Sequence, residues 1–360
     1  MNPRSRRSGR GRRTGIVLTG GTVGSTYLDD GDGDGAPVVR LGRDGTEVPT
    51  PELELLRASD PFEGRDVAVR RPVELLSENF LPEDWPKIAA AIEDLVATEG
   101  AEEILIFHGT DTMTFTSAAL AFLLPTIPVP VVLTGANKPS DQRGSDAFAN
   151  VEAAFHALAG LPNGVYIVFA GAPNRPGLVY SPTRSRKQHA SGRAFASVNR
   201  RPPGRVDAGV LEFRGPPRPD GYLYLPRLSH PDAAVVRIQL YPGLDLDRYG
   251  AMLDGHSIRG VVIELYPSFT ASERSPRYSL RRFVERCGES GCLVFAAVGK
   301  HAAGRPSRYE TTSALAREDI HVVSMIPETA TVKLMLALGA TSNPARVVEI
   351  MDTELAGEFA

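Results

Sequence analysis

The chain has 360 residues, of which 42% are hydrophobic and 23% are charged, and its formal net charge is −3. This length is sufficient for a large core and for two domains. The near-neutral balance argues against a protein that binds nucleic acid over its whole surface, because such proteins carry an excess of basic residues. No apolar stretch approaches the ~20 residues that a membrane-spanning helix needs, so we expect no contact with a membrane.

Residues 1–14 form a basic segment, with six arginines and no acidic residue among the first 13. We predict a disordered tail, because the apolar run that follows is too short for a signal peptide and ends at Gly20-Gly21. A weak contact with RNA is the alternative. Cys287 and Cys292 are too few for a disulfide framework or a zinc site, and we expect both to be buried and reduced.

Apolar runs alternate with helical periodicity in the first part of the chain. The pattern predicts strands at 16–18, 103–107, 129–135 and 164–171, and helices near 82–100, 113–124 and 145–159. The continuous apolar run at 103–107 is typical of a strand buried on both faces of a parallel sheet. This alternation indicates an α/β fold with a mainly parallel sheet. Ligands of such sheets bind at the carboxyl ends of the strands, so we expect the site in the loops that follow them.

Residues 200–232 are rich in Pro, Gly and Arg and lack helical periodicity, which predicts a long surface connection. A second α/β series follows, with strands expected at 234–241, 260–266, 292–298 and 321–326. The stretch 327–339 begins with Pro and ends with Gly, as a helix often does. We therefore predict two α/β domains, a larger one at 15–225 and a smaller one at 226–360.

The glycine-rich stretch 19–35, "TGGTVGSTYLDDGDGDG", follows the first predicted strand. A phosphate-binding loop is not supported, because no lysine occurs in the first 80 residues and the glycine spacing differs from G-x-G-x-x-G. Asp30, Asp32 and Asp34 fit the first half of a calcium-binding loop, but its twelfth position is Leu41 instead of Glu. We therefore predict a solvated, mobile loop.

A threonine on this turn, Thr22, is a candidate nucleophile, but a threonine hydroxyl needs a positioned base. Thr110, Asp111 and Lys187 offer one, since a carboxylate can hold a lysine and a neutral lysine can take a proton from a hydroxyl. Taken singly, these residues are better explained as structural, with Thr22 as a helix or turn cap and Lys187 as a solvated charge. Their spacing does not show that they meet in space.

The motifs "TGGT", "HGTDTM" and "RKQHASG" together resemble the bacterial L-asparaginase/glutaminase family, whose nucleophile is a threonine. The resemblance is nearest to the cytoplasmic type I branch and continues through "PVVLTGANKP", "YPGLD" and "PETATVKL". It implies two α/β domains, a cytoplasmic location, and a homodimer or homotetramer with each site near the neighbouring subunit. It also implies hydrolysis of the side-chain amide of L-asparagine, a small-molecule substrate, without a metal or a cofactor.

The resemblance also implies roles for individual residues. Thr22 would be the nucleophile that forms an acyl-enzyme, and Thr110 and Lys187 would together activate water. Asp111 would bind the substrate ammonium and Ser77 its carboxylate, while Glu78 stands where the family commonly has Gln. The carbonyl of Ala136 would lie near the amide, and backbone N–H groups after Gly109 would form the oxyanion site.

The loop after "TGGT" departs from the family. A tyrosine is usual ten or more residues beyond the nucleophile, where this chain reads Asp-Gly-Asp-Gly-Ala. Tyr27, five residues after Thr22, either takes that role or packs at the base of the loop. The acidic loop would repel an anionic substrate unless it points outward. In the second domain, "YPSFTASE" (266–273) replaces a stretch usually richer in Gly and Asn, so the substrate can differ.

Two alternatives to an asparaginase therefore stay open. The first is deamidation or ammonia supply on another substrate, as in the asparaginase-like subunit of the archaeal tRNA-dependent amidotransferase. Binding of tRNA at physiological salt would favour it. The early start of the first strand leaves no room for that subunit's extra N-terminal domain, and we do not expect nucleic acid as a partner. The second is a non-catalytic amino-acid-binding relative, suggested by the missing tyrosine.

Overall fold

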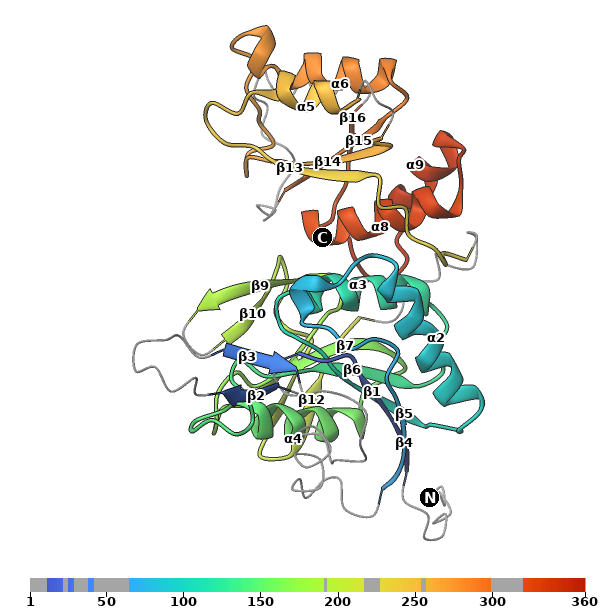
Figure 1. Cartoon of the computed structure of the whole chain (residues 1–360), viewed down its shortest axis with the longest axis vertical. Helices are drawn as coiled ribbons and strands as arrows, with labels where there is room; N and C mark the ends of the chain where they lie inside the picture. The colour runs from blue at the N-terminus through green and yellow to red at the C-terminus, as the bar shows by residue number, and fades with distance from the viewer. Residues whose placement is uncertain are drawn as a thin grey trace.

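The computed structural model of the chain describes residues 12–21, 25–28, 38–41, 65–190, 193–216, 227–253, 257–298 and 320–359. They form two α/β lobes, one above the other in Figure 1. The lower lobe is built on an eight-stranded sheet and the upper lobe on a four-stranded sheet. The expectation of two α/β domains is thus confirmed. The predicted boundary near residue 225 lies outside the described residues.

The sheet of the first lobe has the strand order β12-β11-β8-β7-β6-β5-β1-β4. The five strands from β7 to β4 run parallel, and β8, β11 and β12 are antiparallel to their neighbours. The bounds of the strands are β1 (Arg13–Leu18), β4 (Asp66–Arg70), β5 (Glu103–Phe107), β6 (Pro130–Thr134), β7 (Gly164–Phe169), β8 (Gly177–Tyr180), β11 (Gly204–Asp207) and β12 (Val210–Phe213).

Helices cover both faces of this sheet. On one face lie α2 (Asp84–Ala97) and α3 (Met113–Leu123), and on the other lies α4 (Ala147–Leu158). This explains why β5 and β6 read as continuous apolar runs, since every residue of both strands is buried. Almost every residue of α3 is buried as well, because α3 is enclosed by the sheet, α2 and the second lobe.

The region 200–232 is not a plain surface connection, and this prediction was wrong. It contains the hairpin of β11 and β12, which extends the main sheet. The two strands are joined by Ala208 and Gly209, with φ of 46° and 77°. Positive φ at both turn residues is what a tight hairpin requires. Alanine in the first of these positions is an uncommon choice, which explains why the turn was not recognised.

Two further hairpins lie outside the main sheet. Strands β2 (Ser25–Leu28) and β3 (Val38–Leu41) pair with each other, as do β9 (Ser185–Ala190) and β10 (Arg193–Ser197). Lys187 therefore lies within a strand, which the sequence did not predict.

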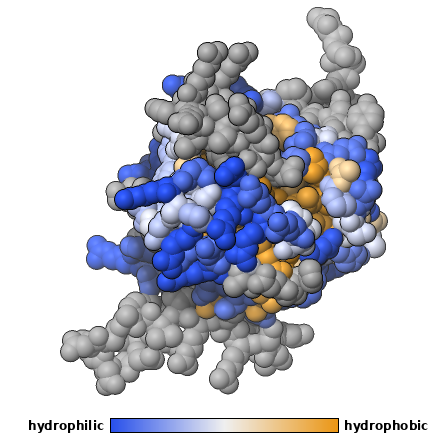
Figure 2. Space-filling view, turned by 90° about the horizontal axis from the view of Figure 1, so that it is seen from above, coloured by the Kyte–Doolittle hydropathy of each residue, from blue (hydrophilic) through white to orange (hydrophobic). Residues whose placement is uncertain are grey.

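The second lobe has four parallel strands, in the order β13-β14-β15-β16. Its elements are β13 (Val235–Gln239), α5 (Leu246–Leu253), β14 (Gly260–Leu265), the 3₁₀ turn η5 (Pro276–Tyr278), α6 (Leu280–Glu289), β15 (Leu293–Val298), β16 (Ile320–Val322), α8 (Pro327–Ala340) and α9 (Pro344–Asp352). Cys287 and Cys292 are buried free thiols, as expected. Figure 2 views the molecule from this end and shows mainly hydrophilic side chains on that face, with a smaller hydrophobic region beside them.

Helix α8 joins the two lobes. It packs on the strands of the second lobe and on α3 of the first (Figure 1). One hydrophobic cluster contains Leu120 of α3, Leu334 of α8 and Val262 of β14, so the lobes share a core. The predicted helix at 327–339 is confirmed. Its position between the lobes explains why several of its polar residues are buried. None of the helices in the described ranges is both long and apolar enough to span a bilayer.

Candidate active site

The turn that follows β1 is pressed against the end of β5. Gly20 and Gly21 have φ of 88° and 99°, a conformation that favours glycine. A Cβ atom on Gly21 would lie 2.5 Å from the backbone nitrogen of Gly109. Thr19 Oγ1 donates a hydrogen bond of 2.8 Å to the Phe107 carbonyl. The turn is therefore held tightly against the end of β5. Thr22, the next residue along the chain, lies outside the described residues.

Three predicted residues come together at this edge of the sheet. Lys187 Nζ donates a hydrogen bond to Thr110 Oγ1 and lies 3.5 Å from Asp111 Oδ1. Thr110 is buried, while 62% of the Asp111 side chain is exposed. The hydroxyl, amine and carboxylate groups of the predicted set are thus adjacent, although 77 residues separate Thr110 from Lys187.

The surroundings of Lys187 shift its titration to lower pH. Burial lowers the pKa of its amine below the usual value, and this effect exceeds the opposing influence of Asp111 and Asp146. The amine also lies 5.7 Å from the centre of the Phe195 ring. A lower pKa leaves more of the amine neutral at a given pH, and only the neutral amine can accept a proton.

Ser77 is brought to the same place by the 3₁₀ turn η3 (Ser77–Asn79). A Cβ atom on Gly109 would lie 2.6 Å from Ser77 Oγ, so the two residues are in close contact. Thr112 Oγ1 fixes the turn with a hydrogen bond of 2.8 Å to the Ser77 carbonyl. Ser77 is only 4% exposed, whereas Glu78 is exposed to solvent.

The loop after β6 is ordered by two residues that the sequence did not single out. Asn150 Nδ2 donates to the Gly135 carbonyl over 2.8 Å, which fixes the backbone beside the buried Ala136. Asp146 accepts hydrogen bonds of 2.9 Å from both the backbone and the side chain of Asn137. The only sequence signal was a polar Asn on the inner face of a predicted helix, which is too common to identify a function.

His108 lies directly behind the site. Burial lowers the pKa of its imidazole to about 4, so the ring is neutral at physiological pH. Its Nδ1 is 2.7 Å from the Gly109 carbonyl, and a neutral ring donates there if Nδ1 carries the proton. The ring also packs against Phe80, with the ring centroids 4.6 Å apart and the planes tilted by 43°. His108 therefore supports the backbone next to Thr110.

Other predicted features cannot be placed in the site. The backbone of Tyr27 is paired with Val39 in the hairpin of β2 and β3, but its side chain lies outside the described part of the chain. The acidic stretch 30–35 and the basic residues 1–11 lie outside it as well. Within the described ranges, no group of three or more His, Cys, Asp or Glu side chains is arranged to hold a metal.

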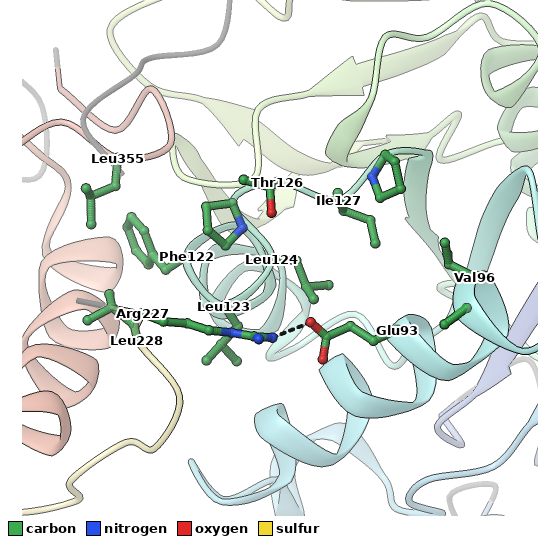
Figure 3. Close-up of a pocket in the computed structure, with 13 residues that line it drawn as sticks. Glu93, Val96, Phe122, Leu123, Leu124, Thr126, Ile127, Arg227, Leu228 and Leu355 are labelled. Carbon is green, nitrogen blue, oxygen red and sulfur yellow. Dashed lines mark hydrogen bonds and ion pairs between the residues drawn. The ribbon is translucent and has the colours of Figure 1, made fainter. Parts of the chain in front are cut away.

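A separate hollow of about 470 Å³ lies where the two lobes meet (Figure 3). It is lined by the ends of α2 and α3 together with Leu228 and Leu355, and Arg227 forms an ion pair with Glu93 across it. None of the predicted site residues lines it. This hollow is therefore distinct from the place where Thr110 and Lys187 meet.

Residues 13–219 match the family described as "Asparaginase, N-terminal", a span that includes Ser77, Thr110 and Lys187. The chain belongs to the asparaginase family. The thermostable L-asparaginase from Thermococcus kodakarensis has the same fold, with a TM-score of 0.77 and 28% identity. That match covers 97% of this asparaginase-family chain and 99% of the T. kodakarensis protein. The predicted family is thus confirmed.

Curated relatives carry a different name, that of a glutamyl-tRNA(Gln) amidotransferase subunit. The relative from Methanosphaera stadtmanae is 31% identical over 356 residues, which are 96% of this chain and 76% of the relative. The relative of the same name from Metallosphaera sedula is 33% identical over 298 residues, 79% of this chain and 65% of the relative. This asparaginase-family chain thus spans about two thirds to three quarters of the length of these relatives. The family indicates an amidohydrolase-type enzyme.

Proposed function

We propose that this chain is an L-asparaginase-type amidohydrolase, which converts L-asparagine into aspartate and ammonia. The observation that supports it best is the hydrogen bond between Lys187 Nζ and Thr110 Oγ1. A lysine whose pKa is lowered by burial holds a neutral amine more often, and a neutral amine takes a proton from a hydroxyl group. The match to a complete L-asparaginase, 99% of which is covered, supports the same activity.

In the proposed reaction, Thr22 Oγ attacks the carbon of the side-chain amide, and its proton passes to the leaving nitrogen. The C–N bond breaks, ammonia leaves, and the acyl group stays on Thr22 as an ester. Thr110 then takes a proton from a water molecule while giving its own to Lys187. The water oxygen bonds to the acyl carbon, the ester bond breaks, and the proton on Lys187 restores the hydroxyl group of Thr22.

The substrate would be held through its two charged ends. We assign its α-ammonium group to Asp111, whose carboxylate is largely exposed, and its α-carboxylate to Ser77 beside Gly109. The carbonyl of Ala136 would face the amide, and backbone N–H groups after Gly109 would stabilise the oxyanion. A cytoplasmic location and a homodimer or homotetramer, without metal or cofactor, complete the proposal.

Ammonia release from L-asparagine, L-glutamine, D-asparagine and amidated peptides tests the proposal. We expect turnover of L-asparagine that is abolished in Thr22→Ala and Lys187→Met. We also expect hydroxylamine to intercept the acyl-enzyme and form aspartyl hydroxamate. A wild-type protein that releases no ammonia, or a Thr22→Ala variant with full activity, would overturn it.

A second candidate function is favoured by the curated relatives and by one surface feature. Their name indicates an amidotransferase that acts on glutamyl-tRNA(Gln), in which this chain would release ammonia for a partner protein. A hollow of about 480 Å³ beside β9 and β10 is lined by Arg193, Arg200 and Arg201 and by no acidic residue. None of these three exposed arginines forms an ion pair within the described residues. Such unpaired guanidinium groups suit the phosphates of RNA.

Binding of tRNA over a series of salt concentrations separates the two candidates. If RNA occupies this hollow, changing Arg193, Arg200 and Arg201 together to Gln should lower the salt-dependence slope by about 2–3. A control with Arg143, Arg248 and Arg281 changed to Gln loses the same charge elsewhere on the surface. Equal binding by both variants argues against the amidotransferase. Vigorous turnover of free asparagine without a partner favours the asparaginase.

A further inference from the structure

Strand β9 carries two neighbouring charged residues that serve different lobes. Among the described strands it pairs with β10 alone, in a two-stranded sheet separate from the main one. Successive side chains of a strand point to opposite sides. Lys187 is directed to Thr110 in the first lobe, and Arg186 is directed to carboxylates of the second lobe.

Arg186 enters a cluster of four charged residues at the lobe junction. Its Nη2 lies 2.8 Å from Glu328 Oε1, at the start of α8, and 3.4 Å from Glu264 Oε1, on β14. Arg237, on β13, completes the cluster, with its Nη2 at 2.6 Å from Glu264 Oε2 and 3.2 Å from Glu328 Oε1. Among the described residues, this cluster pairs two positive charges with two negative ones, and Arg186 is its member from the first lobe.

The carboxylates of this cluster are well shielded from solvent. Glu264 is 7% exposed and Glu328 is 9% exposed, so salt and water weaken their ion pairs less than those on a surface. Glu328 also lies in the first turn of α8, where the helix dipole favours a negative charge. The second lobe therefore offers Arg186 a well-buried anchor, in which two carboxylates outnumber the one guanidinium group of Arg237.

We propose that Arg186 is a positioning residue, through which Glu264 and Glu328 of the second lobe hold Lys187 against Thr110. The proposal deepens the proposed function and rests on it, because it concerns the lysine that moves the proton there. It makes the second lobe part of the catalytic apparatus without placing any of its residues in contact with the substrate.

Loss of the ion pairs of Arg186 should change the pKa of Lys187, which a general loss of stability would not do. If β9 moves, Lys187 becomes more exposed, and the burial that lowers its pKa is relieved. Its pKa then rises towards the usual value, so the ascending limb of the pH–rate profile moves to higher pH. Misplacement of the amine also lowers kcat more than it changes KM.

Arg237 provides a matched control, because it binds the same two carboxylates from within the second lobe. We expect Arg186→Gln to lower kcat by about 10- to 100-fold and to shift the ascending limb to higher pH. Arg237→Gln should lower the Tm but keep kcat and the limb near those of the wild type. Arg186→Lys should restore part of kcat, since one amine can still reach Glu328. Identical kcat and pH limbs for Arg186→Gln and Arg237→Gln would refute the proposal.

A second measurement does not depend on turnover. The chain has only five lysines, Lys87, Lys138, Lys187, Lys300 and Lys333, so pH-dependent acylation followed by mass spectrometry can report on Lys187 separately. We expect its reactivity to titrate at higher pH in Arg186→Gln than in the wild type or Arg237→Gln, with exposed Lys87 as the internal reference. Unchanged titration would overturn the positioning role. Absent turnover with this shift present would refute only the proposed hydrolysis.

Discussion

The proposed proton transfer depends on the hydroxyl group of Thr110. Thr110→Val keeps the shape of the buried side chain but removes the oxygen that accepts from Lys187. Because general acid–base assistance contributes about 10²- to 10⁴-fold, we expect kcat for asparagine hydrolysis to fall by about that factor. Thr126→Val, at an exposed position away from the site, is the control and should keep full activity. A Thr110→Val variant as active as this control contradicts the role of Thr110.

The pH dependence of hydrolysis should report the titration of Lys187. As a base it must be neutral, so kcat rises with pH through its pKa, which burial lowers below the usual value for lysine. Asp111 opposes this shift by stabilising the charged amine. Asp111→Asn should therefore move the ascending limb to lower pH and, since the substrate loses a partner, raise KM. A limb that stays in place, or moves to higher pH, argues against this coupling.

The structure brings Thr110, Asp111 and Lys187 together, a proximity that the sequence alone could not establish. The motifs predicted that Thr110, Asp111 and Lys187 act together, but no spacing along a chain shows that residues 77 positions apart meet. Only the family resemblance implied that contact. Asp146 and Asn150 were missed because hydrogen bonds that order a loop leave no pattern in a single sequence. The contacts do not test any catalytic or binding role, so the roles of Thr22, Tyr27, Ser77, Thr110, Asp111 and Lys187 all stay predictions.

At the scale of elements, substitution in the double-glycine turn after β1 tests whether the close approach of this turn to β5 is required for stability and activity. Gly21→Ala places a methyl group against the backbone of Gly109, in addition to straining a positive φ. Gly100→Ala has the strain alone, because its φ is 66° and no atom lies within 4 Å of the added carbon. The control should lose about 1–2 kcal/mol of unfolding free energy. Gly21→Ala should lose more and also most of its activity, as measured by urea unfolding and ammonia release.

Strand β5 and helix α8, two of the elements that sequence reasoning identified, are buried on most sides. Most of their residues are apolar, so their patterns do not depend on distant contacts. Strand β9, "SRKQHA", is polar and charged, because its side chains reach across to partners in both lobes. The hairpin of β11 and β12 was missed for a different reason, an alanine in a turn that favours Gly or Asn.

At the scale of the whole molecule, a buried ion pair ties the C-terminal segment to the lobe junction. Lys333 of α8 and Glu358 have fully buried side chains, and Lys333 Nζ donates to Glu358 Oε1 over 2.6 Å. The same amine donates to the Thr353 carbonyl over 2.6 Å. Thr183 of the first lobe donates to the Ala356 carbonyl of the same segment. The segment thus packs against both lobes around one buried charge pair.

Removing one member of this pair should destabilise the whole chain. Lys333→Met leaves the Glu358 carboxylate buried without its cation, which typically costs about 3–5 kcal/mol of unfolding free energy. Adding Glu358→Leu removes that orphaned charge, so the double variant should be more stable than Lys333→Met alone. Lys87→Met, which breaks an ion pair whose lysine is exposed, is the control and should change little. Urea unfolding followed by Trp85 fluorescence and by circular dichroism gives these values.

The same experiment reports on the core that the lobes share. Trp85 senses the first lobe, whereas circular dichroism senses both. Because the hydrophobic cluster runs from α3 through α8 to β14, we expect the two signals to coincide in the wild type. Lys333→Met weakens α8 at the junction, so the whole transition should move to lower urea without separating into two. Separate transitions in the wild type would show that each lobe is stable alone, and that α8 joins them without coupling their unfolding.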